Sequence, residues 1–579
     1  MKRSVALLAL LAPLAVFASV VVSASVARAA EAGPDVIYYN GKIVTLDAAE
    51  STAGAVAVKD GKFLKVGSAE EVKALAGPAT KLVDLGGRTV VPGLIDAHCH
   101  PMETIMMKDG WVDCRYPGCP SVKQALANIA AWAAKTPKGK WIFAAAVSAS
   151  ENKFAEKRLP TKAELDAAAP DNPTILADGT HLAVANSMAL KELGVTKGVS
   201  ALKGGGSAIL DKDGEPTGTL TDAMGAVPDT PSLADLEDYY TRGIQDFWNA
   251  YGFTSLLAIT PSAALPVLQG VAAKMKPSIR YTVSVWTEPD AGGMPEDLRA
   301  FTMPAGADPA WYRFAAIKDW VDGENDCRTG YMYERYKGHF DTDPKGDKGT
   351  LVTPLPVVEN FAGIAEKNGV ICMLHCSGDR AMDIGLTAYE NQVKRGEPDT
   401  IKRIEHFGMF QMTDEQLKRA VALVPHGFNV SIQPTWLLDL VKADYENMGG
   451  KLASTGFEFR KMIDAGLEPP AGTDMTGIYM ANINPLTAIY ACVTRNSDMG
   501  VFQPEEAVSV TEALKMWTVW AARSMGEFDV KGSIEPGKYA DMAVLSDDIF
   551  TMPKEGLKDV RVLRTIVGGD VVYEAKETK

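Results

Sequence analysis

Short apolar runs alternate with helix-forming stretches through the middle of this 579-residue chain, and this alternation constrains the fold most strongly. Strands that alternate with helices build parallel βα units, and so many units favour a closed barrel over an open sheet. An open, doubly wound sheet is the alternative, but the glycine fingerprint of a dinucleotide site is missing. We therefore predict an α/β fold, a (β/α)8 barrel of the TIM type. The candidate strands are residues 140–148, 173–179, 254–260, 278–287, 312–320, 369–376, 401–408, 429–434 and 468–474.

The two ends of the chain carry a different pattern, in which alternating runs surround tight-turn dipeptides. Asn-Gly at 40–41, Asp-Gly at 60–61 and Gly-Gly at 568–569 each predict a β-hairpin. The two ends therefore indicate parts of one small β-sandwich domain. The predicted division of the chain is 30–92 for the first part of the sandwich, 93–530 for the barrel with a long insertion around 104–240, and 531–579 for the second part.

The first 29 residues have the layout of a secretory signal peptide, with a basic start, an apolar stretch and the small-residue site Ala27-Arg28-Ala29. Cleavage there predicts an exported protein, periplasmic or secreted. An uncleaved membrane anchor is the alternative, because the apolar stretch nears spanning length. No later segment is apolar enough to span a bilayer, so no stable membrane insertion is expected after cleavage.

The net charge of the chain limits the kinds of macromolecule that it is expected to bind. The whole chain carries a net charge of −14, and removal of Lys2, Arg3 and Arg28 leaves −17. Such an acidic protein argues against nucleic acid as a partner.

Seven cysteines are an odd number, so at least one thiol of an exported chain should stay free. Cys114 and Cys119 lie close enough in sequence to form a small disulfide in an oxidising compartment. The sequence leaves open whether they do.

His98 and His100 end an apolar run, VVPGLIDAHCH. Alternate side chains of a strand share one face, so both imidazoles can point at one metal ion. Two buried, hydrogen-bonded histidines are the alternative for this pair alone.

Three later polar residues also stand at the ends of apolar runs. His375 ends 369–375, His406 follows 401–405, and Asp474 closes 468–474. In a parallel barrel the catalytic side chains come from the carboxyl ends of the strands. These residues are therefore candidates for one shared site with His98.

Lys318 lies near the end of the otherwise apolar run 312–320. Burial there would penalise the charged form of the amine. A salt bridge with Asp319 or Asp322 is the alternative.

Taken in order, these residues resemble the metal-dependent amidohydrolase superfamily, and the resemblance covers nearly the whole chain after the leader. The segments that carry this resemblance are GKIVTLD at 41–47, VVPGLIDAHCH at 90–100 and GSIEPGKYADMAVL at 532–545. Within the superfamily, the chain looks most like the branch that contains N-substituted formamide deformylase. The segments that carry this closer likeness are 375–383, 403–408, 484–495 and 532–545.

The resemblance implies a divalent metal centre of one or two ions. His98, His100 and Asp474 would hold the first ion, and His375 and His406 the second. Lys318 would carry a carbamate that bridges both ions. Zinc is the default for imidazole and carboxylate ligands, although these ligands also suit manganese, iron and nickel.

The resemblance also implies the reaction, which is hydrolysis of a carbon–nitrogen bond in a small-molecule amide that is not a peptide. Metal-bound hydroxide would attack the carbonyl carbon, with Asp474 as the catalytic proton carrier. Two alternatives stay open: a non-hydrolytic enzyme of the same fold, such as a decarboxylase or isomerase, and a binding or regulatory protein without activity. A homo-oligomer is the default expectation for assembly.

Three further residues are weaker candidates for contact with the substrate: His181, Arg328 and Trp436. His181 lies in a segment that resembles a pocket wall of the branch, and Arg328 in one where relatives keep Ser-Arg-Thr. A packed histidine and a structural salt bridge are the alternatives. Trp436 stands where many relatives have histidine, and Met475-Thr476 replaces their Trp-Pro after the final aspartate. These departures argue against assuming a formamide substrate.

Overall fold

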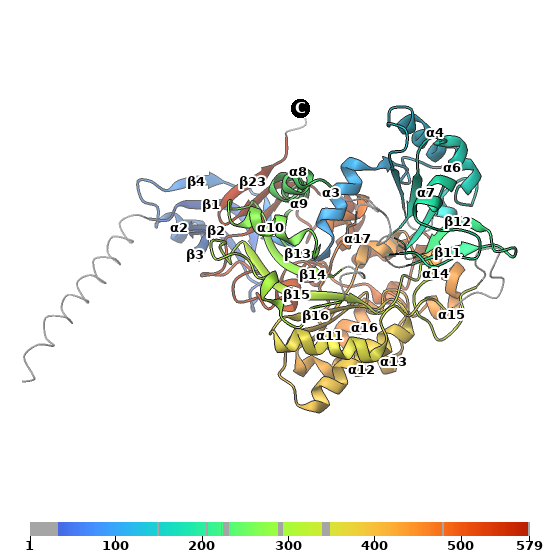
Figure 1. The fold of residues 1–579 in the computed structure, drawn as a ribbon. Coiled ribbons are helices and arrows are strands. Elements are labelled where there is room, and N and C mark those ends of the chain that lie inside the picture. Colours follow the sequence, from blue (N-terminus) through green and yellow to red (C-terminus); the bar gives the residue numbers. More distant parts are fainter. Residues whose placement is uncertain are drawn as a thin grey trace, which may run out of the picture.

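The structure is a computed structural model that describes residues 33–147, 150–179, 181–203, 206–221, 223, 231–287, 293–337, 348–476 and 480–576. The predicted signal peptide, 1–29, lies outside the described residues. Figure 1 shows three parts: a sheet built from both ends of the chain, a central barrel, and an inserted α/β unit on the far side of the barrel.

The barrel contains seven parallel strands in the order β18-β17-β16-β15-β14-β13-β6. All residues of β6 and β13, the first two of these strands along the chain, are buried, as expected of strands covered on both faces. The parallel barrel predicted from the sequence is thereby confirmed. The strands are β6 (Leu94–Cys99), β13 (Phe253–Pro261), β14 (Arg280–Trp286), β15 (Tyr312–Trp320), β16 (Ile371–His375), β17 (Lys402–Glu405) and β18 (Phe428–Ser431).

Residues 470–475 close the barrel between β18 and β6. Ala471 bridges in parallel to Ile432 on one side, and Met475 bridges to Cys99 on the other. Gly472 permits this close approach, because a Cβ atom at that position would lie 2.4 Å from the Cβ atom of His98. The segment predicted as the last strand therefore occupies the eighth position of the barrel.

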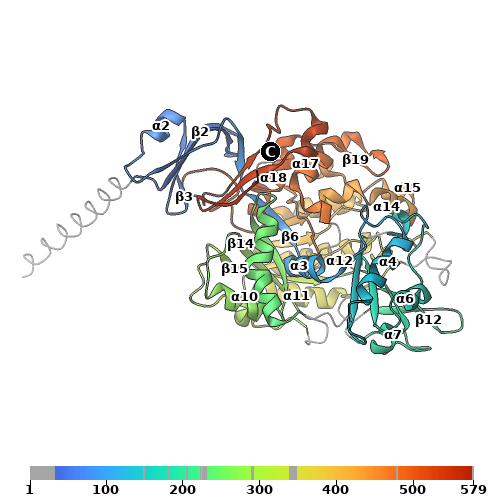
Figure 2. The ribbon, with the colours of Figure 1, turned by 90° about the horizontal axis from the view of Figure 1, so that it is seen from above.

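Helices cover the outside of the barrel and follow its strands along the chain (Figures 1 and 2). Their apolar faces pack on the barrel in one large core. The helices are α3 (Pro101–Gly110), α8 (Leu233–Asp238), α9 (Ile244–Asn249), α10 (Leu265–Ala272), α11 (Leu355–Lys367), α12 (Asp379–Arg395), α13 (Asp414–Leu423), α14 (Val441–Met448), α15 (Gly450–Ala453), α16 (Phe459–Asp464), α17 (Pro485–Thr494), α18 (Val510–Met516) and α19 (Val519–Ser524).

The insertion after α3 has a sheet and a core of its own. The runs 140–148 and 173–179, which the sequence indicates as candidate strands of the parallel units, pair here and not in the barrel. The sheet order is β11-β12-β10-β9-β8-β7. Its elements are β7 (Val112–Asp113), α4 (Val122–Ala133), β8 (Ile142–Ala146), α5 (Ser150–Lys153), α6 (Lys162–Ala168), β9 (Thr174–Asp178), β10 (Leu182–Ala185), α7 (Ser187–Glu192), β11 (Ser207–Leu210) and β12 (Pro216–Thr221).

Both ends of the chain join one eight-stranded sheet, which Figure 2 shows beside the barrel. The C-terminal strands enter it by pairing β21 with β5, at Met542 and Pro92. The sheet contains β1 (Val36–Val44), β2 (Thr52–Lys59), β3 (Lys62–Gly67), β4 (Lys81–Asp84), β5 (Thr89–Pro92), β21 (Met542–Leu545), β22 (Val562–Val567) and β23 (Asp570–Glu574); α2 (Ala69–Lys73) follows β3.

The predicted hairpins at 60–61 and 568–569 are confirmed, but the one at 40–41 is wrong. The chain does not reverse at Asn40; it continues as β1 with a shift in register between Tyr39 and Ile43. Before this shift β1 pairs with β4, and after it β1 pairs with β5. The positive φ of Asn40, 59°, is therefore used by a bulge where β1 changes partner.

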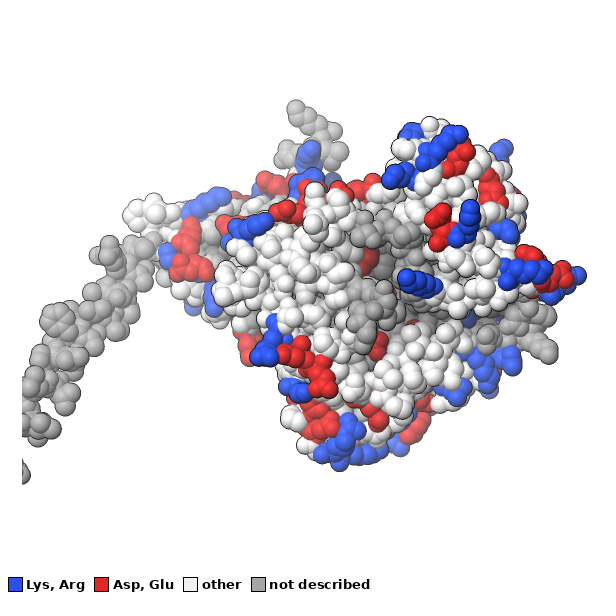
Figure 3. Space-filling model, viewed as in Figure 1, with Lys and Arg blue, Asp and Glu red and all other residues white. Residues whose placement is uncertain are grey.

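Charged side chains of both signs are interspersed around the edge of the face drawn in Figure 3. None of the helices in the described part of the chain combines the length and the apolar character that crossing a bilayer requires.

Candidate metal centre

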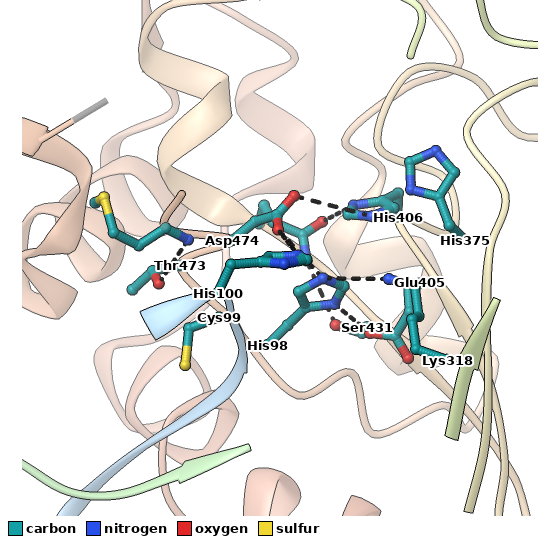
Figure 4. Close-up of polar contacts among 12 residues, drawn as sticks. His98, Cys99, His100, Lys318, His375, Glu405, His406, Ser431, Thr473 and Asp474 are labelled. Carbon is teal, nitrogen blue, oxygen red and sulfur yellow. Dashed lines mark hydrogen bonds and ion pairs between the residues drawn. The ribbon is translucent and has the colours of Figure 1, made fainter. Parts of the chain in front are cut away.

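The two histidines at the end of β6 meet Asp474 of the closing segment (Figure 4). Asp474 Oδ1 lies 3.2 Å from His98 Nε2 and 3.3 Å from His100 Nε2. The backbone N–H of Asp474 donates to the carbonyl oxygen of His98 at 2.8 Å. The position of the carboxylate is thus fixed by the pairing that closes the barrel.

Asp474 is held in a strained backbone conformation, with a φ of 46°. Burial would raise the pKa of its carboxyl group, but the neighbouring imidazoles of His98 and His100 hold the pKa well below its usual range. The lowered pKa makes the carboxyl group anionic, and the side chain keeps an exposed fraction of 14%.

Lys318 points from β15 at the same histidine. Its Nζ atom lies 3.4 Å from His98 Nε2, and the residue is 2% exposed. Burial lowers the pKa of this amine, as expected for a lysine removed from water. Lys318 is therefore a buried amine beside His98, near the end of β15.

A buried carboxylate lies behind His98. His98 Nδ1 lies 2.5 Å from Glu405 Oε2, and Arg403 donates to both oxygens of Glu405, at 2.8 and 2.7 Å. Burial would raise the pKa of Glu405, but the charge of Arg403 lowers it. Because an ionised carboxylate only accepts, the proton of His98 resides on Nδ1, and its Nε2 lone pair faces the site.

His406 is arranged in the same way immediately after β17. Its Nδ1 atom lies 2.8 Å from the amide oxygen of Gln433, which accepts the ring proton and leaves Nε2 as the lone pair. Burial lowers the pKa of His406 to about 3. Its φ is 66°, a second strained backbone position at a strand end. The Nε2 atom lies 3.9 Å from Asp474 Oδ2.

The donor set fits a divalent ion. Nε2 of His98, Nε2 of His406 and a carboxylate oxygen of Asp474 all lie within 4.8 Å of one another. The ring protons of His98 and His406 are both held on Nδ1, so the Nε2 lone pairs of both rings face the Asp474 carboxylate with no proton between them. Lone pairs and a negative charge repel one another, and a cation placed among them would remove this repulsion. Imidazole nitrogens and a carboxylate oxygen, backed by Glu405 and Gln433, are a typical environment for zinc.

His375 belongs to a different group of side chains. Its ring lies 4.5 Å from the ring of His406, centre to centre, but Figure 4 shows it beyond His406 and away from Asp474. His375 Nε2 lies 3.0 Å from the carbonyl oxygen of Gly323 and 3.6 Å from Glu324 Oε2. The structure therefore brings five of the six expected ligands together and places the sixth beside them.

Two of the three expected substrate residues lie against these groups. Trp436 stacks on the ring of His406 at 5.3 Å with an angle of 6° between the planes. His181 lies with its ring 5.8 Å from that of His375. Arg328 lies in the loop after β15 with a φ of 61°.

Comparison with known proteins identifies the family that the sequence resembles. The model of the amidohydrolase family matches residues 81–573, which is most of the chain. The chain belongs to the amidohydrolase family. The N-substituted formamide deformylase of Arthrobacter pascens is 30% identical over 93% of this chain and 98% of that protein. Protein LONG AFTER FAR-RED 3 of Arabidopsis thaliana is 28% identical, over 93% of this chain and 91% of that protein.

Solved structures agree on the fold of this amidohydrolase. An uncharacterized metal-dependent hydrolase from Pyrococcus horikoshii aligns with a TM-score of 0.68 and 23% identity, over 90% of this chain and 99% of that one. At this identity the likeness concerns the fold alone.

Sequence reasoning missed four residues at the site of this amidohydrolase: Arg403, Glu405, Gln433 and Glu324. Arg403 and Glu405 alternate along a buried strand, and charged residues at such positions are a signal of a buried pair that could have been noticed. Glu324 lies in a loop, where no periodicity indicates the direction of a side chain.

Proposed function

We propose that this amidohydrolase is a metal-dependent hydrolase that cleaves the carbon–nitrogen bond of an amide other than a peptide bond. The observation that carries the proposal is the 3.2 Å approach of Asp474 Oδ1 to a His98 ring whose proton is held on the opposite side by Glu405. The other ligands proposed for this first ion are His100 and His406.

A divalent ion in this place would polarise a carbonyl oxygen and acidify a water molecule. The chain's own groups supply the proton transfers. Asp474 takes a proton from water as the water oxygen bonds to the carbonyl carbon. The same carboxyl group then gives that proton to the amine nitrogen as the carbon–nitrogen bond breaks. One amide and one water become one carboxylic acid and one amine.

We also propose that Lys318 is carboxylated. Its lowered pKa supports a population of neutral amine, the form that attacks carbon dioxide; the nitrogen–carbon bond forms and one proton is released. The carbamate oxygens would then face the first ion beside His98. Lys318→Ala should remove metal and activity together, and a variant that keeps both near the parent level would refute this role.

The substrate class is proposed from the family and the pocket wall. The Arthrobacter relative is named for N-substituted formamides, which are amides with a substituent on nitrogen. In this chain the indole of Trp436, 8% exposed and stacked on His406, places an apolar surface against the reacting region. We therefore favour N-substituted amides with an apolar group on nitrogen or on the acyl side.

Export is a further proposal, supported by the basic, apolar and small-residue layout of residues 1–29. Sequencing the N-terminus of the protein recovered from the cell envelope fraction of a bacterial host tests it. A new N-terminus near residue 30 supports export, and an intact Met1 in the cytoplasm refutes it.

The experiment for the function uses the purified chain, loaded with zinc, and a panel of N-acyl amines, N-acyl amino acids, cyclic amides and esters in ¹⁸O-labelled water. Hydrolysis places labelled oxygen in the acid product, whereas decarboxylation or isomerisation does not. Asp474→Asn should abolish turnover, and Asp548→Asn, which removes the carboxylate that pairs with Lys42 of β1, should not. Absence of turnover across the panel, or a product without label, would contradict the proposal.

A further inference from the structure

Two tryptophans stand at the open end of the barrel, beside the metal centre. Trp286 is the last residue of β14 and Trp320 is the last residue of β15. Their rings meet edge to face, with centres 5.3 Å apart and an angle of 81° between the planes. We propose that this pair binds the acyl group of the substrate, whereas Trp436 binds the substituent on the amide nitrogen. The inference rests on the proposed hydrolysis of an amide and assigns each end of that amide to one side of the barrel.

Both rings of the pair face the interior of the barrel. Lys318 points at His98, and side chains two residues apart on a strand share a face, so Trp320 points the same way. The Nζ atom of Lys318 lies 5.1 Å from the centre of the Trp320 ring. Trp286 contacts Trp320 and packs on an apolar cluster that includes Ile259 of β13. Because both tryptophans stand at strand ends and are only partly buried, their open surface faces the mouth of the barrel.

Trp436 stands across the barrel from this pair. The barrel has eight positions, which are its seven strands and the closing segment 470–475. Trp436 follows β18, and β14 lies four positions from β18 in either direction around this ring. A substrate held at the metal centre therefore has Trp436 on one side and the pair of Trp286 and Trp320 on the other.

Asp474 determines which end of the amide points to which side. In the proposed reaction its carboxyl group gives a proton to the amine nitrogen, so this nitrogen must come within hydrogen-bonding distance of the carboxyl oxygens. Asp474 lies in the closing segment, which is the neighbour of β18. Its Oδ2 atom lies 3.9 Å from Nε2 of His406, the ring on which Trp436 stacks. The substituent on nitrogen is therefore directed toward Trp436.

The acyl group is then directed toward the Lys318 side of the centre. Figure 4 shows the carboxylate of Asp474 and the side chain of Lys318 on opposite sides of the His98 ring. His98 Nε2 lies 3.2 Å from Asp474 Oδ1 and 3.4 Å from Lys318 Nζ. A carbonyl carbon whose nitrogen lies near Asp474 extends its other substituent toward β15 and β14, where Trp320 and Trp286 stand.

The two indoles fit an apolar, planar acyl group. An indole offers a large apolar surface, against which another ring packs either offset and parallel or edge to face. Small-molecule sites are lined mainly by such surfaces, with a few polar groups that fix the orientation of the ligand. The substrate class that uses both sides of the barrel is therefore an N-substituted arylacetyl amide with a second apolar group on nitrogen.

The test measures the binding of two small probes to the zinc-loaded chain by isothermal titration calorimetry. Phenylacetate carries its ring on the acyl side and benzylamine carries its ring on the nitrogen side, and neither needs to be hydrolysed. Trp286→Leu should weaken phenylacetate binding by about 10-fold or more and benzylamine binding by less than about 2-fold, and Trp436→Leu should do the reverse. Acetate, which lacks the ring, should bind equally to all three proteins. Trp132→Leu, at a partly exposed indole on α4 of the insertion, is the matched control and should behave like the parent.

Hydrolysis gives a second readout. The kcat/KM for N-methyl-2-phenylacetamide should fall about 10-fold in Trp286→Leu, and the kcat/KM for N-benzylformamide should fall by a similar factor in Trp436→Leu. If Trp286→Leu does not fold, Trp320→Leu takes its place. Equal effects of Trp286→Leu on both probes, no effect on either, or no binding of phenylacetate by the parent would overturn the assignment. Ring-dependent binding of both probes without turnover of any amide would instead refute the proposed hydrolysis and keep the two binding surfaces.

Discussion

Thr473 Oγ1 donates a hydrogen bond of 2.6 Å to Asp96 Oδ2, which joins the closing segment of the barrel to its first strand. Asp96 also accepts from the backbone N–H of Thr473 at 2.9 Å and from the indole N–H of Trp248 at 2.9 Å. All of these groups are buried. The bond lies one residue before Asp474, so it sets where the carboxylate of the metal centre stands.

Thr473→Val tests the hydrogen bond to Asp96, because valine keeps the shape of the side chain and removes the hydroxyl donor. The variant should unfold with a free energy about 1–3 kcal/mol lower, since it leaves a buried acceptor with one partner fewer. Zinc affinity should fall as Asp474 loses its fixed position. Urea unfolding and zinc titration measure the two effects. Parent-like values in both would show that Thr473 has no positioning role.

Glu405→Gln should disturb the orientation of His98 without removing any ligand. Loss of an outer carboxylate partner typically costs about 10–100-fold in metal affinity. Arg403, which is fully buried, would also lose its charge partner, and breaking such a pair costs about 3–5 kcal/mol. Zinc affinity is compared with that of Glu390→Gln, which removes a carboxylate from the part-buried pair with Arg419 on the outer helices. An equal, small effect in both variants would contradict the role of Glu405.

The metal-free protein should lose stability as the pH falls below about 6.5. Burial lowers the pKa of His406 to about 3, so between pH 6.5 and 3 the unfolded chain binds a proton that the folded chain does not. Stability is therefore complete above the unfolded pKa and falls with decreasing pH, by about 1.4 kcal/mol for this residue at pH 5.5. Burial lowers the pKa of His375 and His100 in the same direction.

Urea unfolding of chelator-treated protein at pH 7.5 and 5.5 measures this dependence. His406→Asn should show a smaller difference between the two pH values than the parent, whereas His426→Asn, at an exposed histidine, should match the parent. A His406→Asn variant with the full pH dependence would contradict the assignment.

Cys114 and Cys119 are predicted to form a disulfide once the protein is in an oxidising compartment. Both are free thiols in the structure, and their side chains are in hydrogen-bonding contact. The closed loop is short, so the gain should be about 2 kcal/mol. Mass spectrometry after treatment with oxidised glutathione should show the loss of two hydrogen atoms, absent in Cys114→Ser. Two titratable thiols after this treatment would refute the disulfide.

Much of the barrel could be predicted because the parallel strands are buried on both faces and end in polar residues. The run 312–320 coincides with β15, and the polar ends of the runs coincide with the site. The insertion strands 140–148 and 173–179 could not be told apart from barrel strands, because composition is the same in both sheets. Their partners are decided by tertiary packing.

The turn at 40–41 and the surroundings of His375 show where local patterns fail. Asn40-Gly41 supplies the positive φ that a hairpin needs, but the same conformation serves a bulge where β1 changes partner. Glu324 and His181 come from segments outside regular strands. Their approach to His375 depends on how the insertion packs on the barrel, which no short-range pattern contains.

The most direct test of the metal centre is a zinc titration of chelator-treated protein, in which bound zinc and amide hydrolysis are measured in the same samples. The account predicts that metal-free protein has no activity and that activity returns in proportion to zinc bound at this centre, with no recovery in His98→Ala or Asp474→Asn. Full hydrolysis by protein that elemental analysis shows to be free of metal would contradict it.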